Sequence, residues 1–114
     1  MTYNVNVSRQ VFRDIEQAIL FKKYISTYER TIQSFIINLD TLIYEILTDN
    51  PKQGPCLSYR LIIKTPIRYS IHDEYLLFYD INDHLMQVNV LRLLPAKSDG
   101  MNTFLHYHDR NITD

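Results

Sequence analysis

The hydrophobic period of residues 2–99 changes in a fixed order along the chain, and this order most constrains the fold. Tyr3, Val5 and Val7 alternate with asparagine or serine, which predicts a short strand with one buried face. Two amphipathic segments with helical spacing follow, and three β-rich runs come after them. The sequence therefore predicts one strand, two helices and three further strands in a small α+β domain.

Two helices are predicted before the first proline. Ser8 is a suitable N-cap for the first, because its hydroxyl can accept a hydrogen bond from an unpaired backbone N–H. Apolar residues recur at three- and four-residue spacing through residues 11–25, and a second apolar stripe covers residues 32–47. The Asn-Pro pair at 50–51 ends the second helix, since proline disfavours helical backbone in the residue before it. The break at residues 26–27 is short, so the helices are expected to form an antiparallel hairpin.

The β-rich part of the chain follows a loop at residues 51–55. Residues 59–64 are predicted to be a strand, which the Thr-Pro pair at 65–66 breaks or bulges. The strand is expected to continue through residues 67–71, and residues 72–74 predict a turn.

A hairpin of two further strands is predicted next. Residues 75–81 are almost continuously apolar, which is typical of a central strand covered by helices on at least one face. We expect Tyr75 and Tyr79 to pack in the core. A turn at 82–83 then leads into a last strand at 85–93. The predicted fold class is α+β, in the order β-α-α-β-β-β, with a helical hairpin packed on a small, mainly antiparallel sheet.

Composition limits the classes of protein to consider. The chain has 114 residues, 46% of them hydrophobic, and a net charge of −1. We expect one domain at residues 1–99 and a tail at residues 100–114, where the apolar pattern fades. The near-neutral charge counts against bulk binding of RNA or DNA. The single cysteine, Cys56, excludes an internal disulfide and is expected to be half-buried. We recognise no signal peptide or membrane-length apolar run, so a cytoplasmic protein is expected.

Five segments stand out by their order and spacing. They are Tyr3-Asn4-Val5-Asn6-Val7-Ser8, Asp14-Ile15-Glu16 with Tyr24-Ile25, residues 46–54, Tyr75-Leu76-Leu77-Phe78-Tyr79-Asp80-Ile81, and residues 92–99. Together they resemble the RelE/ParE superfamily of toxins from bacterial type II toxin–antitoxin systems. The resemblance covers residues 2–99 and implies a growth-inhibiting toxin that a cognate antitoxin neutralises.

Two positions depart from the superfamily members that cut ribosome-bound mRNA. Pro95 stands where those members often carry a histidine and cannot act as an acid or base, and Leu76 replaces an arginine. The resemblance therefore favours a ParE-like toxin, which binds DNA gyrase and needs no nuclease site. Two alternatives stay open. One is a RelE-like, ribosome-dependent mRNA endonuclease, and the other is an inactive relative that acts as a protein-binding module.

Positive charge concentrates in residues 51–70, which contain no acidic residue. Arg60 and Lys64 lie an even number of residues apart, so on an unbroken strand they would share a face. Such a face suits phosphates or an acidic antitoxin segment, or else it is a solvated edge protected by charge. In the endonuclease alternative, Arg92 and Lys97 would join them at the phosphate. The candidate target- or phosphate-binding residues are therefore Arg60, Lys64, Arg68, Arg92 and Lys97.

No metal or cofactor is predicted. The acidic stretch at residues 72–74 falls in a turn without a recognised ligand spacing, and the His-Tyr-His-Asp cluster at 106–109 lies in the tail. The expected partners are a cognate antitoxin, with DNA gyrase or the ribosome and its mRNA as target, and no membrane. An apolar groove near the helical hairpin is expected to receive the antitoxin. Both a homodimer and a hetero-oligomer with the antitoxin are compatible with the sequence.

Overall fold

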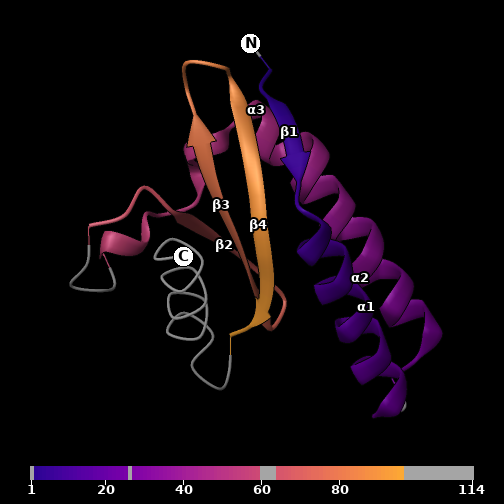
Figure 1. Ribbon diagram of the computed structural model, residues 1–114. Coiled ribbons are helices and arrows are strands. Elements are labelled where there is room, and N and C mark those ends of the chain that lie inside the picture. The colour runs from indigo at the N-terminus through magenta and orange to yellow at the C-terminus, as the bar shows by residue number, and fades with distance from the viewer. Residues whose placement is uncertain (1, 26, 60–63, 97–114) are drawn as a thin grey trace.

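The computed structural model describes residues 2–25, 27–59 and 64–96. Its helices are α1 (Arg9–Tyr24), α2 (Glu29–Thr41) and α3 (Leu47–Asp49), and its strands are β1 (Asn4–Val7), β2 (Arg68–His72), β3 (Tyr75–Asn82) and β4 (Gln87–Pro95) (Figure 1). A π-helical turn at Leu42–Ile46 joins α2 to α3, and short 3₁₀ turns lie at Pro51–Gln53 and Leu57–Tyr59. Among the described residues, none of the helices combines the length and apolar character needed to span a bilayer.

The four strands form one sheet in the order β1-β4-β3-β2. β1 pairs in parallel with β4, whereas β3 pairs antiparallel with both β4 and β2. The strands β3 and β4 therefore lie inside the sheet, which confirms the central position predicted for the apolar run at 75–81. The first and last strands are neighbours, so α1 begins beside β4 (Figure 1).

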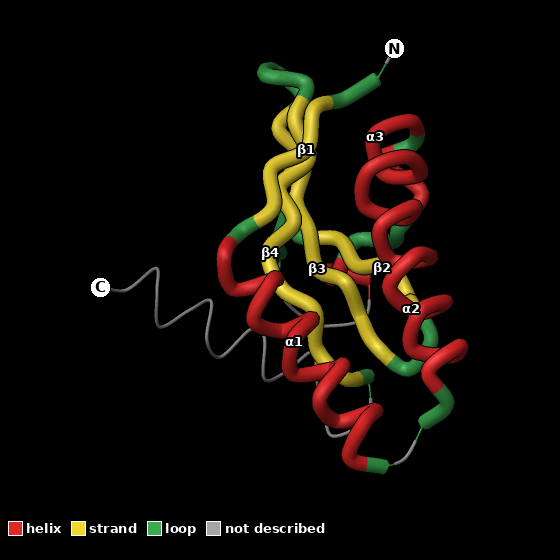
Figure 2. The backbone as a smooth tube through the Cα atoms, turned by 90° about the vertical axis from the view of Figure 1, so that its right-hand side faces the viewer, coloured by secondary structure: helices red, strands yellow, loops and turns green. Residues whose placement is uncertain are grey.

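The helical hairpin covers one face of this sheet, as the pattern predicts (Figures 1 and 2). The main core lies between the two layers and comprises Val11, Ala18, Phe35, Leu39, Leu42, Ile43, Leu47, Tyr75, Leu77, Tyr79, Val88, Val90 and Leu93. Tyr75 and Tyr79 are both buried, which confirms their predicted packing. A second cluster comprises Leu57, Ile67, Tyr69, Leu76, Phe78 and Leu94. Because side chains alternate along a strand, β3 contributes to both clusters, and this explains its continuous apolar sequence.

The start of α1 differs from the expected cap. Ser8 occupies the N-cap position, but its side chain makes no capping hydrogen bond. Its Oγ instead donates to the Leu91 carbonyl oxygen at 3.0 Å, and the Val11 N–H bonds to the Ser8 backbone carbonyl at 3.1 Å. The Ser8 side chain therefore ties the start of the helix to β4, while its backbone carbonyl accepts the N–H of Val11 in the first turn.

The strand predicted at residues 59–64 is wrong where it can be compared. Its first residue ends a 3₁₀ turn at Leu57–Tyr59, Lys64 lies in no strand, and residues 60–63 lie outside the described chain. The expectation that Arg60 and Lys64 share a strand face therefore loses its basis.

The proline at residue 66 explains why β2 starts only at Arg68. The Thr65 hydroxyl accepts the Ile67 N–H at 3.2 Å, and the Ile67 carbonyl accepts the Leu57 N–H at 2.8 Å. Both Ile67 groups face away from β3, on the side where the Tyr69 N–H bonds to the Pro55 carbonyl. The next residue that faces β3 is Pro66, which has no N–H to donate to a longer ladder.

The turn between β3 and β4 is also longer than predicted. β3 extends to Asn82, the chain reverses through residues 83–86, and β4 starts at Gln87 rather than at residue 85. The Asn82 Oδ1 accepts the Leu85 N–H at 3.0 Å, and Met86 has a φ of 51°. The Asn82 side chain therefore stabilises a wider reversal than a two-residue turn.

Candidate functional site

The element that lies beside the outer edge of β4 changes halfway along the strand. β1 covers this edge only as far as Val90, which pairs with Val7. Leu91 is an extra residue in β4, since Phe78 pairs with Arg92 while Tyr79 pairs with Val90. Beyond this bulge α1 replaces β1 as the neighbour of β4. A side chain of the helix, Asp14, then accepts a hydrogen bond from a backbone N–H of the strand.

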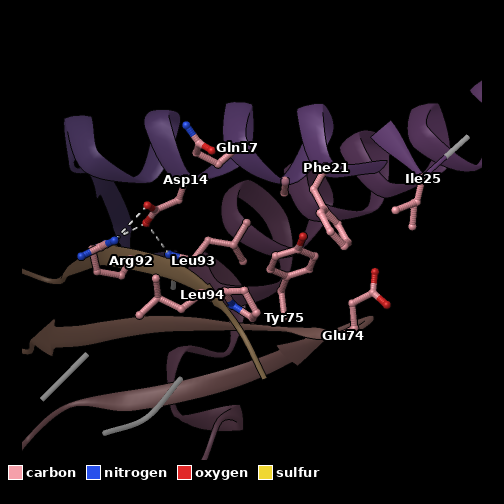
Figure 3. A pocket seen from close by; sticks show the side chains of 11 residues that line it. Asp14, Gln17, Phe21, Ile25, Glu74, Tyr75, Arg92, Leu93 and Leu94 are labelled. Atoms are coloured by element: carbon pink, nitrogen blue, oxygen red, sulfur yellow. Dashed lines mark hydrogen bonds and ion pairs between the residues drawn. The ribbon is translucent and has the colours of Figure 1, made fainter. Parts of the chain in front are cut away.

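Asp14 on α1 is the main contact at this edge. Its Oδ2 accepts the Leu93 backbone N–H at 3.0 Å and the Arg92 Nε at 2.8 Å, and its Oδ1 accepts the second Arg92 bond at 3.0 Å (Figure 3). Gln10, one turn earlier, also donates to Oδ1 at 3.3 Å. The Asp14 carboxylate is buried, so these charge-assisted bonds satisfy a group that would be costly to bury alone.

An open groove of about 750 Å³ lies next to this ion pair, between the second half of α1 and the ends of β3 and β4 that face the hairpin tip. Its walls are residues of both layers: Asp14, Gln17, Ala18, Phe21 and Ile25 from the helical side, and Glu74, Tyr75, Arg92, Leu93, Leu94 and Pro95 from the sheet side (Figure 3). The groove lies near the helical hairpin, where the sequence predicts one. Most of its lining is apolar, and carboxylates stand at both ends.

A buried cation lies next to the Glu74 end of the groove. Lys22 lies in the last turns of α1, and its Nζ bonds to the Glu74 Oε1 at 3.0 Å. The same Nζ lies 4.6 Å from the ring centroid of Phe35 and 5.7 Å from that of Tyr75. The Lys22 side chain is 7% exposed and the Glu74 side chain 52% exposed, so the carboxylate is the solvent-facing member of the pair.

The groove opens onto a set of exposed apolar side chains at the end of the hairpin. We call these residues, Leu20, Phe21, Tyr24, Ile25 and Tyr28, the hairpin-end patch. Tyr24 is 85% exposed and Tyr28 is 83% exposed. Single exposed apolar residues are ordinary, but Phe21 and Ile25 also line the groove, and exposed apolar residues gathered at a groove are typical of an interaction surface.

The predicted basic residues have separate surroundings. Arg68 donates from Nη1 to the Gly54 carbonyl at 2.7 Å and to the Lys52 carbonyl at 3.4 Å, while Arg92 is held by Asp14. Lys64 is exposed outside any strand. The role of these residues in binding stays a prediction, as does that of Arg60 and Lys97, which lie outside the described residues.

Ligands for a metal ion do not gather in the part of the chain that the structure describes, where no group of three His, Cys, Asp or Glu side chains could hold an ion. Cys56 is half-buried, as expected, and its Sγ donates to the Thr65 carbonyl at 3.0 Å. His72 is buried on the Phe35 ring, with Nε2 3.2 Å from the Phe35 carbonyl oxygen, so it is a packed core residue here.

Comparison with known proteins identifies solved structures with a similar fold. No family model and no curated protein sequence matches the chain. Among solved structures, a chain of the toxin–antitoxin complex RelBE2 from Mycobacterium tuberculosis matches 83% of this chain and 99% of its own length, with a TM-score of 0.57 and 16% identity. A chain of the archaeal RelE–RelB complex from Pyrococcus horikoshii matches 86% of this chain and 99% of its own, with a TM-score of 0.50 and 20% identity. The predicted resemblance is thus confirmed at the level of the fold: the chain has the α+β architecture found in RelE toxin–antitoxin complexes.

Proposed function

We propose that this chain is the toxin component of a toxin–antitoxin pair, neutralised by a cognate antitoxin. The observation that carries the proposal is a RelE-type fold with a mostly apolar groove, lined in part by the exposed side chains of Phe21 and Ile25 from the hairpin-end patch. Both of the similar solved structures are complexes of a toxin with its antitoxin. An apolar surface of this kind is stable in water when a protein partner occupies it.

The proposed mode of action is binding and blocking of a protein target, with DNA gyrase favoured. Arg92 is held by a buried carboxylate, and Arg68 by two loop carbonyls. A phosphate would have to compete with Asp14 for the Arg92 guanidinium, and Pro95 offers no proton for transfer. These features support a toxin that acts without cleaving RNA.

Ribosome-dependent cleavage of mRNA is the second candidate, because the similar structures are complexes of RelE-type proteins. In this case Arg60, Lys64 and Lys97 would supply the positive charge. An inactive relative that serves as a protein-binding module is the third candidate, and it predicts a chain that leaves growth unchanged.

Induced expression with pulse labelling separates these candidates. Gyrase inhibition should stop incorporation of thymidine before that of methionine, and the purified chain should inhibit supercoiling of plasmid DNA by gyrase. Arrest of methionine incorporation first, with cleaved mRNA and loss of the effect in the R60A/K97A variant, would favour the endonuclease. Co-expression of the partner encoded by the neighbouring reading frame should restore growth. Normal growth on induction of the chain alone would contradict the toxin proposal.

A further inference from the structure

The outer edge of β1 carries backbone groups without a hydrogen-bond partner. β1 is the first strand in the sheet order and pairs only with β4. The Asn4 N–H bonds to the Met86 carbonyl at 2.8 Å, and in a parallel ladder alternate residues direct both backbone groups to the same side. Val5 and Val7 therefore direct their N–H and C=O groups away from β4. Within the described chain, no residue forms a hydrogen bond with these groups.

Among the described residues, none of the usual devices blocks this edge at Val5 and Val7. Natural proteins protect a free sheet edge with charged side chains, proline, a bulge or a covering element. Residues 2–8 contain no charged residue and no proline, and β1 pairs with β4 in a regular register. α3 reaches only the start of the strand, where the Thr48 carbonyl accepts the Tyr3 N–H at 2.8 Å. In Figure 2, which views the molecule from the β1 side, α2 and α3 lie beside this strand, so a further strand can reach its edge.

An apolar hollow lies next to the end of this edge. It has a volume of about 90 Å³, and Val7 lines it together with side chains of α1, α2 and the π-helical turn. Phe12 and Tyr44 at this hollow are 51% and 45% exposed. Because side chains alternate along a strand, Val5 and Val7 lie on the same face of β1, the one that packs on the main core. A valine of an added strand on this face would extend the apolar contact towards Phe12 and Tyr44.

The free backbone groups of two copies of the chain complement each other in one antiparallel register. With Val5 of one copy opposite Val7 of the other, each residue donates its N–H to the opposite C=O, and a two-fold axis relates the two halves. Every free group of Val5 and Val7 is then bonded in both copies. The register with Val5 opposite Val5 also pairs Tyr3 with Val7, and it is disfavoured because the Tyr3 N–H already bonds to Thr48.

Asn6 falls on the two-fold axis in this register. It lies between the two valines, and its exposed side chain is on the opposite face of the strand, where it would meet Asn6 of the second copy. Two carboxamides can donate to and accept from each other, and neither carries a charge that repels the other. The centre of the interface is thus as self-complementary as its backbone, which favours a second copy of the chain as the occupant of this edge.

We propose that two copies of the chain pair through the outer edges of their β1 strands and form a symmetric dimer with one continuous sheet. The interface consists of the backbone from Val5 to Val7, the Asn6 pair on the axis, and the apolar side chains around Phe12 and Tyr44. None of these residues lines the groove on the other side of α1, so the dimer does not depend on the proposed function.

Charge substitutions at the axis test the dimer. Sedimentation equilibrium of the purified full chain should show a monomer–dimer equilibrium. Asn6→Lys places like charges opposite each other and should weaken dimerisation at least about tenfold, while Asn4→Lys, an exposed control on the same face and off the axis, should change it less than about twofold. An equimolar mixture of Asn6→Lys and Asn6→Asp should dimerise again, which a folding defect does not explain. A wild-type chain that stays monomeric up to its solubility limit, or an Asn6→Lys dimer as tight as the wild type, would overturn the inference.

Disulfide formation and hydrogen exchange test the register. Residues opposite each other in a non-hydrogen-bonded antiparallel pair have Cα atoms about 4.5 Å apart, within the range that a disulfide spans. In a Cys56→Ser background, Asn6→Cys should therefore form a disulfide-linked dimer on mild oxidation, and Asn4→Cys should form much less. Amide exchange at Val5 and Val7 should slow as the dimer forms, because their N–H groups have no acceptor in the single described chain.

Two results of these measurements would contradict the assignment. Equal crosslinking of Asn6→Cys and Asn4→Cys would show that the dimer does not use this register. Amides of Val5 and Val7 that slow only when the product of the neighbouring reading frame is added would show that a partner strand, and not a second copy, occupies the edge.

Discussion

The Asp14 carboxylate accepts hydrogen bonds from the Arg92 guanidinium through both of its oxygens, although the two residues are 78 positions apart in the sequence. The same carboxylate also accepts the backbone N–H of Leu93. One buried side chain of α1 therefore fixes both the side chain and the backbone of the last strand. This contact sets the position of α1 against β4 and forms one end of the groove.

Replacement of Asp14 by alanine should lower the free energy of unfolding by about 3–5 kcal/mol. The substitution removes the buried carboxylate that accepts from the Arg92 guanidinium and from the Leu93 N–H, and loss of one member of a buried pair is strongly destabilising. Urea denaturation of the purified chain measures the change. Asp40→Ala, which removes an exposed carboxylate from α2, is the matched control and should change the stability by less than about 0.5 kcal/mol. Equal effects of the two substitutions would show that the Asp14 contact does not stabilise the fold.

Replacement of Gly54 by alanine should also destabilise the fold. An added Cβ would collide with the carbonyl oxygen of Tyr69 and would lie 2.6 Å from the Tyr79 hydroxyl. That hydroxyl accepts the Gly54 N–H at 3.1 Å and donates to the Pro51 carbonyl at 2.7 Å, so it cannot move away without losing both bonds. We expect a loss of about 1–3 kcal/mol, measured by thermal or urea unfolding. Gln53→Ala, at the neighbouring position, should have a much smaller effect, and a stable Gly54→Ala variant would contradict this account of the loop.

The order of the elements could be predicted from the sequence because each has a distinct hydrophobic period. The central position of β3 could also be predicted, since a continuous apolar run is typical of a strand covered by helices on at least one face. The structure shows that both faces of β3 are packed. The start of β2 at Arg68 lies within one residue of the strand predicted at 67–71 after the Thr-Pro break. The strand predicted at residues 59–64 is wrong at its described ends, because the β-propensity of a segment depends strongly on its tertiary context.

The candidate site could likewise be predicted only in part from the sequence. Asp14 and Arg92 each belong to a segment that supports the resemblance, but nothing in a single sequence shows that they bond to each other. The hairpin-end patch could have been identified from the sequence. Tyr24, Ile25 and Tyr28 exceed what a single apolar stripe at the end of a helix requires, and such an excess indicates exposed apolar surface.

Replacement of Lys22 by methionine should change stability by less than about 1 kcal/mol, whereas replacement by alanine should cost about 2 kcal/mol or more. Methionine keeps the apolar stem that packs on Phe35 and Tyr75, and it leaves behind a Glu74 side chain that is half exposed and can be hydrated. Alanine removes the stem as well and opens a cavity. Urea denaturation of both variants distinguishes packing from charge. A methionine variant as unstable as the alanine variant would show that the ion pair, and not the stem, stabilises this end of α1.

Alkaline pH should unfold the chain in part through its buried tyrosines. Burial raises the pKa of both Tyr75 and Tyr79 above the ordinary value of 10.0, and for Tyr79 this effect outweighs the opposing influence of its contact with Gly54 and of the nearby Arg68 charge. A group whose pKa is higher in the folded state stabilises the fold fully below its unfolded pKa, and this contribution is lost as the pH rises through the folded pKa. The free energy of unfolding should therefore fall above about pH 10, and tyrosinate absorbance should show these side chains ionising together with unfolding. In the Tyr75→Phe variant the fall should be shallower. An unchanged pH dependence in that variant would rule out Tyr75 as one of its sources.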